Sequence, residues 1–420
     1  MRKYFLWYHF FRLILVGSGL RLFYKKIRIE GKDKIPPNVP ILIVPNHQNS
    51  FMDALLITSN LQRSLYFLTR AKAFKTKFMN WYLRSLQMLP VYRVRDGMKN
   101  IQKNEAIFQT CVDKLTNKEA VLIFAEANHD LRRRLRPLSK GFTRIAFDAE
   151  IQNNWELDLY VMPVGVNYSD HRNSRNEVRV VYGDFREIYE SDARSAANDL
   201  KNATSNGLKE TIMHVPKLNQ YPLVKVALDE LEPDRSKLAN PVYMNSLVEK
   251  LNEKQTENLI SSAENILNIA DENNLEVRRI AEVKRPKLKL ILLFPIYLFV
   301  WLNSIIPYQP TRKIIQDKVD DPAFEASIKF VLGLFLFPIF YFLVFGILLI
   351  IGVPFIWAIT YLVFSLLTST MFKRANEAIE NFMDKKKVHK YKENNPEQYI
   401  QLIRSIEEIK AFRLELLTSE

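Results

Sequence analysis

The sequence predicts an α/β domain that lies between an N-terminal helix at a membrane interface and a set of C-terminal membrane helices. Two observations lead to this prediction. From about residue 38 to residue 190, short apolar runs alternate with helical stretches, which is typical of an α/β domain. Residues 290–311 and 330–372 contain no charged residue, and a buried soluble helix of that length would be unusual.

Residues 1–30 are predicted to form an interfacial, membrane-anchoring helix. Aromatic and aliphatic residues lie beside Arg12, Arg21 and Lys25, as in helices that lie in the plane of a bilayer surface. Arg12 interrupts the apolar run and no small-residue cleavage pattern follows, so a removed signal peptide is not expected. An ordinary packed N-terminal helix is the alternative.

The α/β domain itself is predicted to span residues 31–195. Four short apolar runs are interpreted as strands, at residues 41–44, 66–69, 120–124 and 160–166. Each run ends in polar residues, proline or glycine. Functional groups are therefore expected at the carboxyl ends of the strands.

Three regions follow this domain. Residues 196–285 are predicted to form a helical extension, residues 286–372 a transmembrane or membrane-embedded region, and residues 373–420 a basic helical tail. Lysines and arginines flank the membrane region on both sides, which favours an even number of crossings with both flanks in the cytoplasm. The two charge-free runs could supply three spans, so either one segment is re-entrant or interfacial, or the rule fails here.

The charge balance indicates anionic partners. Among 420 residues, 60 are Lys or Arg and 46 are Asp or Glu, for a formal charge of +14. Phosphate groups, an anionic membrane surface or nucleic acid would each suit such a chain. Cys111 is the only cysteine, which excludes an internal disulfide and a cysteine-based metal cluster and fits a reducing compartment.

The strongest candidate for chemistry follows the first predicted strand. Residues 45–53 read Pro-Asn-His-Gln-Asn-Ser-Phe-Met-Asp, which places His47 just ahead of Asp53. Histidine is the side chain best matched to proton transfer at neutral pH, and a carboxylate on its other ring nitrogen would set its tautomer. Taken alone, His47 could be a hydrogen-bonded loop residue. His129 beside Asp130 is a rival pair, although adjacent side chains in an extended loop diverge.

With three further blocks in the same order, this stretch resembles the glycerophospholipid acyltransferase family. The further blocks lie at residues 89–97, 125–141 and 162–168. In the family, four residues separate the histidine from the aspartate. Here five do, as in a subgroup similar to fungal-type glycerol-3-phosphate acyltransferases. The resemblance implies a mixed sheet flanked by helices, and acyl transfer with His47 and Asp53 as a general-base dyad and no covalent enzyme intermediate.

Several substrate-binding roles are also implied by this resemblance. Arg93 matches the arginine that contacts the acceptor phosphate, and Glu126 would orient the acceptor or a phosphate-binding arginine. Lys140 begins a helix that borders the site, and Gly165 would help to shape an apolar wall for the acyl chain or its carrier. Ala127 stands where the family has glycine, which predicts a different backbone conformation at that position.

Clustered cations independently indicate a phosphate-bearing acceptor. Arg70 and Arg93 fall at predicted strand ends, as do several other basic residues, and the planar fork of arginine binds phosphate oxygens in pairs. No groove-reading motif accompanies these residues, so nucleic acid is not the expected partner.

The predicted activity is transfer of a fatty acyl group from acyl-CoA or acyl carrier protein to glycerol 3-phosphate or 1-acylglycerol 3-phosphate. It would serve phospholipid biosynthesis next to membrane phospholipid, need no metal or cofactor, and take place on a domain facing the cytoplasm. The sequence does not indicate an oligomeric state. Two alternatives stay open: an acyltransferase for another lysolipid or amino-lipid acceptor, and a non-catalytic lipid-binding scaffold.

Overall fold

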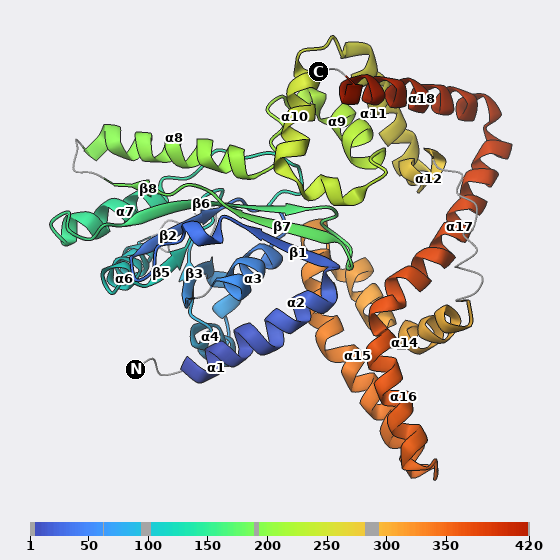
Figure 1. The fold of residues 1–420 in the computed structure, drawn as a ribbon, viewed down its shortest axis with the longest axis horizontal. Helices are drawn as coiled ribbons and strands as arrows, with labels where there is room; N and C mark the ends of the chain where they lie inside the picture. Colours follow the sequence, from blue (N-terminus) through green and yellow to red (C-terminus); the bar gives the residue numbers. More distant parts are fainter. Residues whose placement is uncertain (1–4, 62, 94–101, 189–192, 282–293, 419–420) are drawn as a thin grey trace. The chain divides into compact units, whose positions relative to one another are not determined.

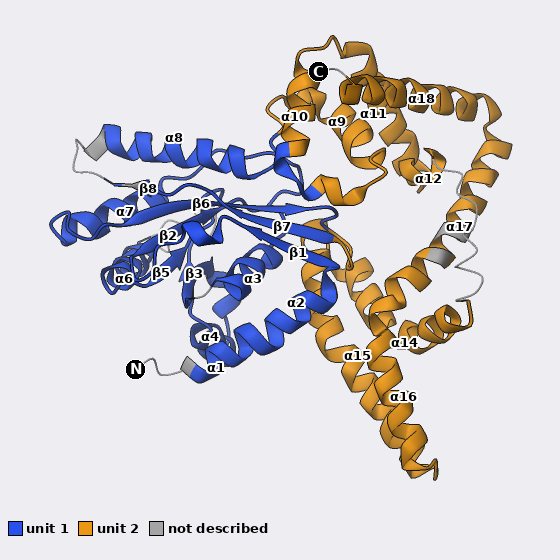
Figure 2. Cartoon of the chain, viewed as in Figure 1, with its two compact units in different colours: residues 1–171, 177–214, 239–242 blue, residues 172–176, 215–238, 243–420 orange. Residues whose placement is uncertain are grey.

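The computed structural model describes residues 5–61, 63–93, 102–188, 193–281 and 294–418 (Figure 1). The chain divides into two compact units, which Figure 2 colours separately. Unit 1 comprises Met1–His171, Glu177–His214 and Ala239–Val242. Unit 2 comprises Arg172–Asn176, Val215–Leu238 and Tyr243–Glu420. Unit 1 contains the predicted α/β domain, and unit 2 contains the long apolar helices.

Unit 1 is built on an eight-stranded mixed sheet, in agreement with the predicted fold class. The strand order is β1-β7-β6-β2-β5-β3-β4, with β8 paired to β6. Neighbours from β6 to β4 are parallel, whereas β7 is antiparallel to β6, and β1 is parallel to β7. The strands are β1 (Lys26–Glu30), β2 (Ile41–Pro45), β3 (Leu65–Arg70), β4 (Met88–Val91), β5 (Ala120–Leu122), β6 (Tyr160–Tyr168), β7 (Glu177–Tyr182) and β8 (Arg186–Glu187).

Helices cover both faces of this sheet. Its helices are α3 (Phe51–Asn60), α4 (Lys77–Ser85), α6 (Asn104–Thr116), α7 (Gly141–Gln152) and α8 (Ala193–Thr211). Leu42 and Leu68 share a core with α6, α7 and α8 on one face. Phe67 points to the opposite face, toward α3 and the N-terminal helix. Coverage on both sides explains why β2 is a continuous apolar run that is buried throughout, rather than an alternating one.

The N-terminal helix ends earlier than the sequence predicted. It runs through α1 (Phe5–His9), a π-helical stretch η1 (Phe10–Gly17) and α2 (Ser18–Phe23). The last five residues of the predicted helix over 1–30 instead form β1, which pairs with β7. In β1, Ile27 and Ile29 alternate with charged residues, and this period of two favours a strand.

The N-terminal helix has an apolar outer face and a buried arginine on its inner face. Leu6, Phe10 and Ile14 are each more than half exposed. Arg12 is buried and donates a hydrogen bond from Nη1 to the carbonyl oxygen of Arg63 at 2.6 Å. The charge that interrupts the apolar run therefore points into unit 1, and the outer face keeps the apolar character expected of an interfacial helix.

Unit 1 continues past the predicted boundary after residue 195, which falls inside α8. The end of this helix lies so close to β6 that a Cβ atom at Gly165 would stand 2.0 Å from the carbonyl oxygen of Thr211. Helical periodicity alone does not distinguish a helix packed on a sheet from a separate extension, so the sequence pattern placed the boundary too early.

Unit 2 is helical in its described residues. The longer helices are α10 (Pro241–Asn252), α11 (Glu257–Glu272), α14 (Phe294–Lys318), α15 (Glu325–Ile350), α16 (Phe355–Thr368), α17 (Phe372–Asn394) and α18 (Pro396–Thr418). The predicted basic tail is α17 and α18. Ile406 and Ile409 of α18 are buried, and Arg413 forms a buried ion pair with Glu232 at 2.6 Å, so α18 is packed into unit 2 rather than solvated on all sides.

Two helical segments among the described residues are long and apolar enough to cross a membrane, Pro322–Ile350 and Phe355–Glu377. They cover the predicted charge-free run 330–372. The other predicted span, residues 290–311, begins outside the described residues, and its described part lies in α14. That helix does not meet the same requirement, because it carries polar residues and two internal prolines, Pro307 and Pro310.

Gly165→Ala should destabilise unit 1, because the new methyl group would overlap the backbone of Thr211. Over-packing of this kind costs roughly 1–3 kcal/mol or more. We expect a lower thermal midpoint for the full-length protein in detergent. Gly141→Ala is the matched control, since its Cβ would meet Phe108 at an ordinary 3.7 Å. Equal midpoints for the two variants would show that the close approach of α8 to β6 is not as described.

Candidate active site

The residues singled out in the sequence gather at one edge of the sheet. The strands β6, β2, β5, β3 and β4 are parallel neighbours, so their carboxyl ends lie along the same edge. His47 follows β2, Glu126 follows β5, Arg70 ends β3, and Arg93 follows β4. The order of the strands therefore brings together four segments that are far apart in the sequence.

The carboxylate of Asp53, on the first turn of α3, is fully buried and accepts four hydrogen bonds. Its Oδ2 accepts from Nδ1 of His47 at 2.9 Å and from the backbone N–H groups of Gln48 and Asn49 at 3.0 and 2.8 Å. Its Oδ1 accepts from the hydroxyl of Tyr168 at 2.6 Å. A carboxylate that is shielded from water is tolerated only when hydrogen-bond donors satisfy its oxygens in this way.

The imidazole of His47 is held as a neutral base. Because Asp53 only accepts, Nδ1 carries the ring proton and Nε2 keeps its lone pair. The ring stacks on Phe124 with centroids 4.0 Å apart and meets the ring of His129 edge-on at 5.5 Å. Burial lowers the pKa of His47 below its usual value, although the hydrogen bond with Asp53 opposes this shift. At neutral pH the ring is therefore ready to accept a proton.

The extra residue between His47 and Asp53 is absorbed in the turn before α3. Ser50, the residue that precedes the helix, has φ 45° and ψ −122°, outside the usual regions for a residue with a side chain. This turn aims two successive backbone N–H groups at Asp53. Ala127, which replaces the family's glycine, lies at φ 62°. This is the left-handed region, which glycine enters more readily than other residues.

The buried Glu126 forms an ion pair with the partly exposed Arg136. Its Oε2 accepts from Nε of Arg136 at 2.8 Å and from Nη2 at 2.6 Å. Nη2 also contacts the carbonyl oxygens of Asn128 and, at 3.4 Å, of His47. Burial raises the pKa of Glu126 to about 7, although Arg136 opposes the shift. The other carboxylate oxygen, Oε1, is buried without a hydrogen-bond partner among the described residues.

Arg93 belongs to the same network. It donates from Nη1 to Oδ1 of Asn128 at 2.8 Å, while the backbone oxygen of Asn128 accepts from Arg136. Two guanidinium groups from different loops thus meet at one residue, beside the loop that carries His129. Arg95, which lies in the same sequence block as Arg93, falls outside the described residues.

A family model described as Acyltransferase matches residues 26–167, a segment that includes His47, Asp53, Arg93, Glu126 and Arg136. Over this segment, the chain is similar to the glycerophospholipid acyltransferase family.

Two curated relatives agree with this similarity. Over 115 residues, the chain is 25% identical to glycerol-3-phosphate O-acyltransferase 2 of Saccharomyces cerevisiae, covering 24% of this chain and 16% of that protein. Over 147 residues, it is 27% identical to a 1-acyl-sn-glycerol-3-phosphate acyltransferase of Chlamydomonas reinhardtii, covering 34% of this chain and 41% of that protein. The matches thus span less than half of either relative.

Among solved structures, the 1-acyl-sn-glycerophosphate acyltransferase of Thermotoga maritima aligns with a TM-score of 0.38 and 19% identity. The alignment covers 50% of this chain and 83% of that one.

The remaining residues that the sequence predicted for the site are Lys140, Arg70 and Gly165. Lys140 is exposed and directly precedes α7, and its Nζ makes no ion pair with the described residues. Arg70 ends β3 beside Val91 at the end of β4. Gly165 lies within β6, and the space that its side chain would occupy is taken by Thr211. The structure thus gives Gly165 a packing role, and its binding role stays a prediction.

Sequence reasoning assigned no role to Tyr168, the second side chain that holds Asp53. Tyr168 ends β6, 115 residues after Asp53, and only the pairing of β6 with β2 brings the two together. In the rival pair of His129 and Asp130, both carboxylate oxygens of Asp130 accept from Arg132, and the ring of His129 meets that of His47. No group of His, Cys, Asp and Glu side chains within the described ranges could hold a metal ion.

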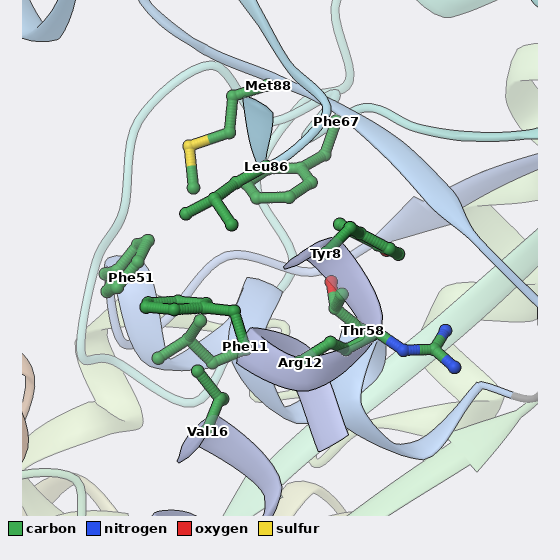
Figure 3. A pocket seen from close by; sticks show the side chains of 10 residues that line it. Tyr8, Phe11, Arg12, Val16, Phe51, Thr58, Phe67, Leu86 and Met88 are labelled. Carbon is green, nitrogen blue, oxygen red and sulfur yellow. The ribbon is translucent and has the colours of Figure 1, made fainter. Parts of the chain in front are cut away.

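An apolar pocket lies along one face of α3 (Figure 3). Phe51, Leu55 and Thr58 line it from α3, at the spacing of one helical face. The other side chains around it come from the N-terminal helix, β3 and the segment around β4, namely Tyr8, Phe11, Arg12, Val16, Phe67, Leu86 and Met88. Asp53 lies on the same helix between Phe51 and Leu55, so α3 connects the pocket with the dyad.

Asp53→Asn should abolish most of the acyl transfer while the fold persists. The amide oxygen would take the place of Oδ2, where Nδ1 of His47 and two backbone N–H groups donate. The neutral amide would no longer stabilise the imidazolium that forms when His47 accepts a proton. We expect kcat to fall roughly 10²- to 10⁴-fold. Asp130→Asn is the control, since Asp130 pairs with Arg132. The dyad assignment would be wrong if Asp130→Asn alone lost activity, or if Asp53→Asn kept it with an unchanged thermal midpoint.

Proposed function

We propose that this protein transfers a fatty acyl group from a thioester donor to a hydroxyl of glycerol 3-phosphate or 1-acylglycerol 3-phosphate. The observation that carries the proposal is the buried His47–Asp53 pair with a neutral imidazole, beside two arginines at the same edge of the sheet. The named relatives act on glycerol 3-phosphate or its 1-acyl form. Both acceptors carry a hydroxyl and a phosphate.

The geometry supports a general-base mechanism. Nε2 of His47 removes the proton from the acceptor hydroxyl as its oxygen attacks the thioester carbonyl. The tetrahedral intermediate then collapses, the carbon–sulfur bond breaks, and the imidazolium returns the proton to the leaving thiolate. Asp53 stabilises the imidazolium in between and keeps the ring oriented. Atoms and charge balance without a covalent enzyme intermediate.

Arg93 and Arg136 are the groups best placed to bind the acceptor phosphate. Both belong to the loops that surround His47, and Glu126 fixes the guanidinium of Arg136 through two hydrogen bonds to one oxygen. Oε1 of Glu126, for which the described part of the chain offers no hydrogen-bond donor, is placed to accept from a second hydroxyl of a glycerol acceptor. A pre-oriented arginine fork favours a phosphate dianion over a neutral headgroup.

The apolar pocket on α3 is the best candidate for the acyl chain of the donor. Its lining is aromatic and aliphatic apart from Arg12 and Thr58, as an acyl chain would require. Acyl-CoA and acyl carrier protein are both compatible with this arrangement.

A position on a membrane surface, with the domain facing the cytoplasm, belongs to the same proposal. The outer face of the N-terminal helix is apolar, and α4 adds the exposed Phe78 and Trp81. The indole N–H of Trp7 donates to the hydroxyl of Ser85 at 3.2 Å, which joins the two helices. Aromatic residues and flanking lysines are typical of helices that lie in a bilayer interface.

The non-catalytic scaffold is supported by no observation here. In the sequence, two differences from the family pattern favour this alternative: five residues instead of four between His47 and Asp53, and Ala127 in place of glycine. The turn at Ser50 accommodates the first, and the left-handed backbone of Ala127 accommodates the second.

An acceptor panel tests the proposed function. We expect turnover with glycerol 3-phosphate or 1-acylglycerol 3-phosphate, and little with a monoacylglycerol that lacks phosphate. Arg93→Ala should raise KM for the preferred acceptor roughly 10- to 100-fold, the effect of losing one charge-assisted hydrogen bond, with a smaller change in kcat. Arg144→Ala, an exposed arginine paired with Glu105 on the surface, is the control. Turnover only with phosphate-free acceptors would exclude this substrate class.

Val16→Phe tests the assignment of the pocket. Val16 is buried in its wall, so a larger ring should shorten the space for the chain. We expect KM for long-chain acyl thioesters to rise, whereas a short-chain thioester keeps its KM. Val242→Phe, at a position that is 75% exposed, is the matched control. An equal effect on donors of every length would place the acyl chain elsewhere.

A further inference from the structure

The two most apolar helices of unit 2 form a hairpin whose surface is largely exposed, although α14 packs on one side of it through Asn303 and Ser304. α15 and α16 are joined by a four-residue turn at positions 351–354. In the most apolar stretch of the first candidate span, Pro322–Ile350, only 6% of the residues are buried. In that of the second, Phe355–Glu377, 28% are buried. A helix that packs into a soluble core is largely buried, so the hairpin has the exposed surface of a helix pair whose solvent is lipid.

The turn at the tip satisfies its own backbone. Val353 donates to the carbonyl oxygen of Leu348 at 2.9 Å, and Gly352, at φ 84°, donates to that of Leu349 at 3.1 Å, the two bonds of a Schellman motif. The next residue, Pro354, has no N–H group, and its carbonyl oxygen accepts from Trp357 at 2.9 Å. A turn with so few unpaired backbone groups does not require water.

The side chains of the tip are apolar as well. From Leu348 to Trp357 the sequence reads Leu-Leu-Ile-Ile-Gly-Val-Pro-Phe-Ile-Trp. Ile350 is 86% exposed, and Ile351 and Ile356 are both more than 60% exposed. If the hairpin crossed a bilayer, these residues would form an aqueous loop without one charged or hydroxyl side chain, at a large hydrophobic cost.

The length of the second arm agrees with a tip that stays in lipid. The charge-free part of this arm runs from Phe355 to Phe372 and rises roughly 27 Å, whereas a bilayer core is ~30 Å thick. Lys373 and Arg374 follow it directly. A tight turn keeps both arms at the same depth, so the shorter arm limits how far the hairpin can penetrate.

Polar and charged contacts surround the opposite end of the hairpin. Glu325, at the start of α15, pairs with Arg172 at 2.5 Å and with Lys329 at 3.3 Å. Lys373, just after α16, donates to Oδ1 of Asn176 at 3.1 Å. Both arms therefore begin among groups that belong in water or lipid headgroups, on one side of the membrane.

We propose that α15 and α16 form a re-entrant hairpin, which enters the hydrocarbon from one face of the membrane and returns to that face. Its tip, residues 348–357, stays within the lipid, and the segments before and after it remain on the same side. This topology gives the charge-free run 330–372 no net crossing. It does not depend on the proposed acyl transfer, since it rests on the hairpin alone.

Single cysteines in the full-length protein test this topology. The native Cys111 is buried and is replaced by alanine. Asp320→Cys and Arg374→Cys report on the two ends of the hairpin, and Ile351→Cys reports on the tip. In sealed membrane vesicles of each orientation, a membrane-impermeant maleimide should label both end positions from one side and the tip from neither side. All three should react after solubilisation in detergent.

A second measurement covers the case in which the tip cysteine reacts poorly. A nitroxide on Ile351→Cys, after reconstitution into phosphatidylcholine vesicles, should collide with oxygen and be shielded from a water-soluble nickel chelate. Labelling of the tip from the side opposite to the ends would show a crossing hairpin. Labelling from the same side, or a nitroxide open to the nickel chelate, would show a hairpin outside the hydrocarbon. Either result would overturn the proposal.

Discussion

The fully buried carboxylate of Asp53 is the constraint on which the site depends. An unpaired charge at this position would cost several kcal/mol, so all four donors must be present at once. His47 and two backbone N–H groups come from the turn between β2 and α3, whereas the hydroxyl of Tyr168 comes from the end of β6. Pairing Asp53 therefore fixes α3 against the sheet and requires β6 to lie beside β2.

A second network connects the other loops to the same centre. Arg136 contacts Glu126, Asn128 and the carbonyl oxygen of His47, and Arg93 joins through the side chain of Asn128. The loops after β2, β4 and β5 are thus held together by charge-assisted hydrogen bonds, which are stronger than neutral ones. Substrate charge would enter a site whose cations are already oriented, so little reorganisation accompanies binding.

Local parts of this arrangement could be predicted from the sequence, and non-local parts could not. His47 and Asp53 lie six positions apart on a strand, turn and helix, so their proximity follows from local geometry. Tyr168 and the docking of α8 on β6 depend on strand order, which apolar runs do not encode. β1 was missed because two alternating isoleucines are a weak signal beside a strongly apolar helix. The pairing of Glu126 with Arg136 could not be predicted without knowing the path of the loop between them.

Under the proposed function, the N-terminal helix lets an apolar substrate and the buried dyad share one small domain. Its inner face lines the pocket with Tyr8, Phe11, Arg12 and Val16, while its outer face exposes Leu6, Phe10 and Ile14. One helix thus separates the pocket from a surface suited to lipid. Each methylene that leaves lipid for water costs about 0.8 kcal/mol, so a long acyl chain moves most easily where apolar surface is continuous. The N-terminal helix is apolar on both faces and so provides a continuous apolar surface. Arg12 is tolerated on the inner face because its guanidinium donates a hydrogen bond to the carbonyl oxygen of Arg63.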